Sequence, residues 1–208
     1  MIKRGSILYI LLTLSLFYLS SCVTVGIEKA KYTVIEKEGK FEIRQYPSYT
    51  IAETIVNDSF DNAGNTAFRR LFDYISGQNR SKESIAMTAP VNQVGGSEKI
   101  AMTAPVNQQK SEDMWSVSFI MPSKYTIKTL PQPLDPNITL REIPPCKMAA
   151  LRYSGTWSRK RYEAKKSLLE QFISNKKLQI IGEAIFARYD PPFQLWFLRR
   201  NEVLIPVE

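Results

Sequence analysis

The chain has 208 residues, of which 44% are hydrophobic and 23% are charged, a composition typical of a folded globular domain. Its formal net charge of +8 could favour an anionic partner, but a solvated surface rich in lysine would give the same charge. The chain contains no histidine, which excludes a Ser-His-Asp or Cys-His catalytic site, a histidine-ligated zinc and a haem iron held by a proximal histidine.

The first residues have the pattern of a secretion leader. Lys3 and Arg4 precede an apolar run over residues 6–19, which is shorter than the roughly 20 residues that a spanning helix needs. The run ends in the sequence Leu19-Ser20-Ser21-Cys22, which resembles a bacterial lipobox. The resemblance implies cleavage before Cys22 and lipidation of this cysteine. The alternative is an ordinary cleaved signal or a short membrane anchor, with Cys22 incidental.

The expected organisation follows from this leader. We expect a signal peptide over residues 1–21, a lipidated tether over residues 22–30 and one domain over residues 31–208. The protein would then be held at the bacterial cell envelope through its lipid anchor. In a cell with two membranes, Val23 after the lipidated cysteine favours the outer membrane facing the periplasm, because an aspartate usually stands there in lipoproteins kept at the inner membrane.

The first predicted strand covers residues 41–44, and the first predicted helix spans Phe60 to Ser76. Ser59 or Asp58 can cap the start of this helix, and Gly77 can end it. Apolar residues at helical spacing predict its buried stripe. The stripe consists of Phe60, Ala63, Ala67, Phe68, Leu71, Phe72 and Ile75.

A nine-residue sequence occurs twice, over residues 85–93 and 100–108, with glycines between the copies. This arrangement predicts two short strands joined as a hairpin. In the next segment, residues 115–121, large apolar residues alternate with Ser116, Ser118 and Ile120, which predicts a strand with one buried face.

The second predicted helix spans Arg159 to Asn175 and is capped by Ser158. Its predicted buried residues are Ala164, Leu168, Leu169, Phe172 and Ile173. Further strands are predicted over residues 147–153, 180–189 and 195–199.

The two halves of the chain resemble each other. A shift of 97 residues aligns the segment 44–47 with 141–144, and the start of the first helix at Phe60 with Trp157. Each half then runs as strand, proline corner, strand and helix, which indicates duplication. Two helices and many antiparallel strands predict an α+β fold.

Four segments carry a resemblance to a known family. Residues 99–106, 115–122, 189–192 and 199–202 resemble motifs of the SOUL haem-binding family, in the family's order. The similarity runs from about Tyr32 to Pro206. The resemblance implies a distorted antiparallel β-barrel, built from two βαββ-type repeats with two helices outside, as in bacterial effector-binding domains.

The resemblance also implies that haem or a related tetrapyrrole binds non-covalently in an apolar cleft beside the first helix and the loop before the last strands. The expected lining residues are Phe68, Arg69, Leu71, Phe72, Met87, Met102, Tyr189 and Phe193. Leu71 and Phe72 are equally expected as core residues, and Arg69 as a solvated one. The chain has Asn65 and Asp73 where haem-binding members carry basic residues.

The expected function is therefore that of a membrane-anchored protein that binds a tetrapyrrole for sequestration or transfer. One alternative is an enzyme or effector-binding module for another small hydrophobic molecule, and a second is an envelope interaction protein without a small ligand. No catalytic residue, metal site or nucleic-acid partner is predicted. The segment 199–202 is predicted to form a turn with locally paired charges, and Cys146 to be a small buried residue.

Overall fold

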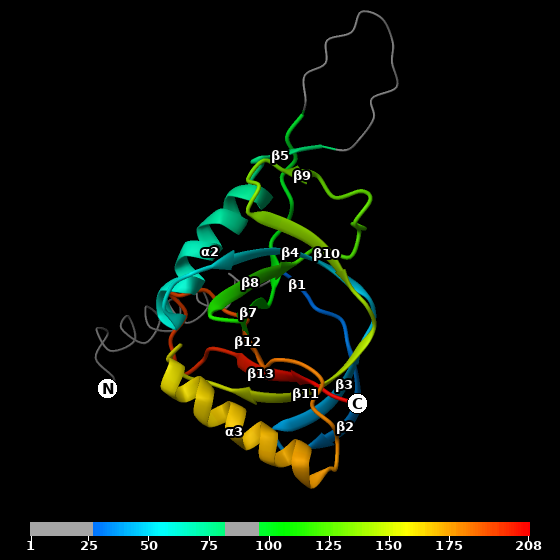
Figure 1. Ribbon diagram of the computed structural model, residues 1–208, viewed down its shortest axis with the longest axis vertical. Helices are drawn as coiled ribbons and strands as arrows, with labels where there is room; N and C mark the ends of the chain where they lie inside the picture. Colours follow the sequence, from blue (N-terminus) through cyan, green and yellow to red (C-terminus); the bar gives the residue numbers. More distant parts are fainter. Residues whose placement is uncertain (1–26, 82–95) are drawn as a thin grey trace, which may run out of the picture.

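The computed structural model describes residues 27–81 and 96–208, so Cys22 and Met87 lie outside it. Within these ranges, two helices cover the outside of one curled sheet (Figure 1). The described elements are β1 Glu28–Lys29, β2 Thr33–Glu38, β3 Phe41–Tyr46, β4 Tyr49–Val56, α2 Phe60–Ile75, β5 Asn79–Arg80, β6 Thr103–Ala104, β7 Val106–Ser111, β8 Met114–Ile120, β9 Gln132–Pro133, β10 Ile138–Ile143, β11 Cys146–Tyr153, α3 Arg159–Asn175, β12 Ile185–Arg188 and β13 Asn201–Pro206.

The large sheet has nine antiparallel strands in the order β10-β4-β8-β7-β12-β13-β11-β3-β2. The sheet and the two helices together form two βαββ units, β4-α2-β7-β8 and β11-α3-β12-β13. The strand that precedes each unit pairs with the other unit, so that β3 lies beside β11 and β10 lies beside β4. The 97-residue shift superposes β3 on β10 and β4 on β11, which confirms the predicted duplication.

The predicted α+β fold is confirmed, with a sheet that curls without closing. The end strands β10 and β2 have one neighbour each in the nine-stranded sheet. Two short pairs lie outside it: β1 runs parallel to β6, and β5 runs antiparallel to β9.

Apolar residues form three clusters, one under each helix and one inside the curl of the sheet. Both faces of strand β8 are buried. Val117 and Phe119 pack under α2, while Ser116 and Ser118 are buried on the opposite face. The prediction of a single buried face for this strand is therefore wrong, because the curl of the sheet encloses its inner face as well.

Helix α2 begins and ends within one residue of its predicted bounds. The Ser59 hydroxyl accepts a hydrogen bond from the Asn62 N–H at 3.3 Å, which caps the first turn. After the helix, Gly77 has φ of +119°, a conformation that a side chain would disfavour. The predicted stripe was too wide on one side, because Phe68 and Phe72 are 36% and 45% exposed. Gly64 and Tyr74, which were not predicted, are buried instead.

Helix α3 has the predicted bounds and the predicted Ser158 cap. Its buried residues are Tyr162, Leu169, Phe172 and Ile173, whereas Leu168 is 43% exposed and Ala164 is exposed. The prediction for Leu168 and Ala164 is wrong, because both fall on the side of the helix away from the buried Leu169 and Ile173. The buried face is completed by Tyr162, which the prediction omitted. Its hydroxyl donates to the Ala184 carbonyl at 3.1 Å.

The last part of the chain differs from two predictions. Residues 195–199 form turns instead of a strand, since Arg199 donates at 2.8 Å to the carbonyl of Gln194 and closes a loop. Asn201 and Glu202, predicted in a turn, begin β13 and are fully buried. Local charge pairing is present, between Arg200 and Glu202 at 2.7 Å.

The beginning of the described chain is held against the domain, because Glu28–Lys29 pairs with β6 although the expected tether extended to residue 30. The second copy of the nine-residue repeat supplies β6 and part of β7, and the first copy lies outside the described residues. No helix in the described ranges has the length and apolar character required to cross a membrane.

Candidate functional site

The outer face of α2 carries two phenylalanine rings one turn apart. Phe68 and Phe72 stack with centroids 5.8 Å apart and an interplanar angle of 13°. The edge of Phe68 rests on the buried ring of Phe119, at 5.3 Å and 61°. The pair therefore presents a supported, partly exposed apolar surface to the outside, which we call the Phe68–Phe72 platform.

An open hollow of about 420 Å³ lies over this platform and is bounded by Asn65, Phe68, Arg69 and Phe72. Arg69 forms no ion pair with any described residue, so its guanidinium is free to meet an acid. The neighbouring Arg70 is engaged, because it donates to the Thr54 hydroxyl at 2.7 Å and pairs with Asp135 at 3.1 Å.

The structure brings together three of the eight expected cleft residues, Phe68, Arg69 and Phe72. Leu71 is completely buried under α2, in agreement with its alternative interpretation as a core residue. Met102 is half-buried against the same cluster. Tyr189 is buried inside the curl of the sheet, and Phe193 projects from the loop after β12; neither borders the hollow over the platform. Met87 lies outside the described residues.

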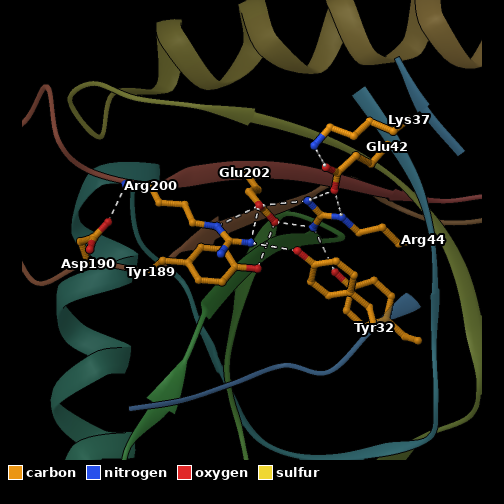
Figure 2. A network of polar contacts seen from close by, with 9 residues as sticks. Tyr32, Lys37, Glu42, Arg44, Tyr189, Asp190, Arg200 and Glu202 are labelled. Carbon is orange, nitrogen blue, oxygen red and sulfur yellow. Dashed lines mark hydrogen bonds and ion pairs between the residues drawn. The ribbon is translucent and has the colours of Figure 1, made fainter. Parts of the chain in front are cut away.

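A buried ionic cluster joins the first and last parts of the fold (Figure 2). Arg44 on β3 meets Glu202 on β13 through two contacts, of 2.6 Å from Nη1 and 3.1 Å from Nη2. Arg200 donates to the same carboxylate at 2.7 and 3.0 Å, and the Tyr189 hydroxyl donates at 3.0 Å. The Glu202 carboxylate therefore receives five hydrogen bonds in a region closed to water.

Aromatic rings and a second acid complete this cluster. The guanidinium of Arg44 lies 4.2 Å above the Tyr32 ring, and that of Arg200 lies 3.9 Å above the Tyr189 ring. Arg44 also donates to Glu42 at 2.8 Å. Burial alone would raise the pKa of Glu202, but Arg44 and Arg200 outweigh it and hold the pKa below its ordinary value.

This cluster serves the fold, because all its charges already have partners. A carboxylate with five donors and a lowered pKa is a poor general base, and its burial keeps substrates away. Sequence reasoning missed the cluster because Arg44 and Glu202 are 158 residues apart. The one available signal was the motif 199–202, whose charges were expected to pair locally in a turn.

A larger hollow of about 510 Å³ was also missed by the sequence prediction. Tyr46, Tyr49 and Tyr125 line it together with lysines such as Lys29 and Lys128. Burial raises the pKa of Tyr46 to about 12, so its hydroxyl stays protonated. Mixed charges and phenols give this hollow a more polar character than the Phe68–Phe72 platform.

A flat apolar ligand fits the platform better than a metal centre does. The described chain has no group of three or more cysteine, aspartate or glutamate residues that could hold a metal ion. Tyr189 is engaged with Glu202, and Met102 packs half-buried against the apolar cluster under α2 and does not border the hollow over the platform, so neither offers an axial ligand there. The residues present therefore suit an apolar ligand with an acidic group, and they offer no ligand to a metal ion that it carries.

Cys146 is half-buried, and burial raises the pKa of its thiol. A raised pKa keeps the thiol protonated, which is the less reactive form. Cys146 was predicted to be buried, and it is only partly buried, packed against the apolar cluster inside the curl of the sheet.

Sequence comparisons place these features among known proteins. The profile described as SOUL heme-binding protein matches residues 27–206. Heme-binding protein 2 of Mus musculus is 24% identical over 187 residues, which cover 84% of this chain and 85% of that protein. Heme-binding protein 2 of Homo sapiens is also 24% identical, over 174 residues that cover 79% and 80% of the two chains.

Solved structures show the same fold at lower identity. A hydrolase from Listeria innocua is similar with a TM-score of 0.56 and 13% identity, over 84% of this chain and 94% of that one. An uncharacterized conserved protein from Listeria innocua is similar with a TM-score of 0.57 and 13% identity, over 81% and 92%. At this identity the likeness concerns the fold alone.

Proposed function

The chain belongs to the SOUL heme-binding protein family, and from this membership we propose that it binds haem or a related tetrapyrrole non-covalently on the Phe68–Phe72 platform of α2. The observation that carries the proposal is the exposed, stacked pair of rings beside an unpaired arginine. A porphyrin has two flat apolar faces and two propionates, so it needs an aromatic support and a cation at its edge.

Each part of the platform has a role in this proposal. Phe68 and Phe72 cover one face of the macrocycle, and aromatic contacts of this kind contribute about 0.5–1.5 kcal/mol beyond the burial of area. Arg69 pairs with a propionate, for which an exposed pair contributes about 0–1 kcal/mol. Asp73 lies close enough to oppose this pairing. Binding is therefore reversible, as sequestration or transfer of a tetrapyrrole requires.

We also propose that the protein is held at a bacterial cell envelope by lipid on Cys22. The support is the sequence Leu19-Ser20-Ser21-Cys22 at the end of an apolar leader. Ile27, the first described residue, stands only five positions later. Five extended residues reach about 17 Å, so the domain would stay near the bilayer. Replacement of Cys22 by alanine should abolish lipid labelling and shift the protein to soluble fractions; unchanged fractionation would exclude the anchor.

The binding proposal is tested by titrating haemin into residues 27–208 and following the Soret band. The paired replacement of Phe68 and Phe72 by alanine should weaken binding at least tenfold. Leu168→Ala is the matched control, since it removes an equally exposed apolar side chain from the other helix. Unchanged affinity in the Phe68 and Phe72 variant would move the ligand elsewhere, with the hollow beside Tyr49 as the next candidate.

A further inference from the structure

The loop between β12 and β13 displays a dense group of exposed apolar side chains. Their exposed fractions lie between 50% and 70%. The group, which we call the 193–198 loop, comprises Phe193, Leu195, Trp196, Phe197 and Leu198. A cluster of this kind on a folded domain usually marks a contact surface.

The backbone of this loop is fixed while its side chains face outward. Arg199 donates to the carbonyls of Pro192 and Gln194, the latter at 2.8 Å. The Gly155 N–H donates to the Trp196 carbonyl at 3.0 Å. The guanidinium of Arg199 also lies 4.5 Å above the Trp157 ring, which ties the loop to the segment before α3. The apolar side chains are thus presented by an ordered support.

A basic border lies next to the loop, at the start of α3. Arg159, Lys160 and Arg161 occupy the first turn, which contains no acid. The positive end of the helix dipole makes three cations unfavourable at this place unless an anion approaches. Arg161 donates to the Ser154 carbonyl at 3.4 Å and therefore lies beside the Gly155–Trp196 contact. Arg159 and Lys160 are exposed.

The acids of this region do not neutralise the border. Asp190 accepts a hydrogen bond from the Arg200 N–H at 2.5 Å and is committed to the loop. Glu163 follows in the next turn of α3 and forms no ion pair with a described residue. Three cations therefore stand beside five exposed apolar side chains, with one acid behind them.

We propose that the 193–198 loop and this basic border dock the domain on an anionic lipid surface. The Trp side chain favours the boundary between headgroups and acyl chains, where its apolar part is buried and its N–H stays in contact with water, and Phe side chains insert beside it. Arg159 and Lys160 meet the lipid phosphates, whose negative surface potential attracts basic segments. The inference goes beyond tetrapyrrole binding and requires no lipid on Cys22.

The test uses the full chain reconstituted into vesicles whose acyl chains carry bromine, a quencher of tryptophan emission. One set of vesicles contains phosphatidylcholine alone, and the other contains an equal share of phosphatidylglycerol. In vesicles with phosphatidylglycerol, the brominated lipid should quench part of the tryptophan emission. In Trp196→Phe this quenched part should be missing, while Trp115 and Trp157 still emit. Phe193→Ser with Phe197→Ser should reduce the quenching, and Leu134→Ser, at an equally exposed site elsewhere, should leave it unchanged.

Four results would overturn the proposal. No quenching of Trp196 in vesicles that carry the protein would place the loop in water. Loss of Trp196 exposure through association with a second copy of the chain, seen as a dimer by sedimentation, would assign the surface to self-association. Quenching that is equally strong without phosphatidylglycerol would show that anionic lipid is not required. Equal quenching after replacement of Arg159 and Lys160 by glutamine would show the same for the basic border. Vesicle flotation measures the lipid anchor on Cys22 separately, because an anchored chain floats with the vesicles whether or not the 193–198 loop is inserted.

Discussion

Arg44 and Glu202 lie 158 residues apart in sequence, and their side chains meet inside the curled sheet at 2.6 and 3.1 Å. Their strands, β3 and β13, are the two neighbours of β11, so the ion pair crosses over that strand. It therefore links the strand exchanged from the first half of the chain to the last strand of the second half. Both side chains are almost wholly buried, which makes the pair sensitive to the loss of either partner.

Replacement of Arg44 by methionine should lower the free energy of unfolding by about 3–5 kcal/mol, because Glu202 is left as a buried charge with fewer donors. Urea denaturation of residues 27–208 measures this change. Arg141→Met is the control, since Arg141 forms a similar two-contact pair with Glu53 at an exposed site and should cost about 0–1 kcal/mol. Equal losses in the two variants would show that burial does not strengthen the Arg44 pair.

Stability should fall in acid through Glu202. Its pKa in the folded state is held below the ordinary value of 4.5, so the ionised carboxylate stabilises the fold above that pH. As the pH falls below about 4.5 and through the lowered pKa, this contribution should be lost. Glu202→Gln should be less stable at neutral pH and should show a shallower acid decline when unfolding midpoints are compared. A parallel decline in both proteins would contradict this assignment.

Arg199→Ala should loosen the 193–198 loop without unfolding the domain. The change removes the donor to the Gln194 carbonyl and the cation above Trp157. Hydrogen exchange should quicken at the amides of residues 193–198, while the amides of β13 keep their protection. If these loop amides exchange at the parent's rate, other contacts fix the loop.

Asp73→Lys should tighten haemin binding. Asp73 borders the hollow next to the platform, where its carboxylate repels a propionate held by Arg69. One charge at 4 Å in water is worth about 1 kcal/mol, so removing the repulsion and adding a cation should tighten binding about fivefold or more. Asp113→Lys, an exposed acid in the turn between β7 and β8, is the matched control and should have no effect. Weaker binding in Asp73→Lys would contradict the expected orientation.

The helices and the duplicated halves were predictable because they depend on local patterns. Ser59 and Ser158 cap the predicted helices, and the 97-residue shift aligns whole strands. Which side of a helix contacts the sheet was less predictable. Phe68 and Phe72 fit the apolar period as well as Leu71 does, and only the position of the sheet leaves them outside.

The buried ionic cluster was not predictable from a single sequence. Arg200 and Glu202 are close in the chain, so local pairing was the economical interpretation, whereas Arg44 comes from the first half. The motif 189–192 was recognised, but the direction of the Tyr189 ring depends on the curl of the sheet. For the same reason the expected cleft between helix and loop separates into the platform on α2 and the 193–198 loop.

The most direct measurement is the mapping of amide chemical shifts in residues 27–208 on addition of zinc protoporphyrin, a diamagnetic analogue of haem. The porphyrin ring current should shift the amides of residues 65–72 most, with smaller shifts at Phe119 beneath the platform. These shifts should vanish when Phe68 and Phe72 are both alanine. Shifts centred on Tyr49, on Phe193 or on no defined region would contradict tetrapyrrole binding on the outer face of α2.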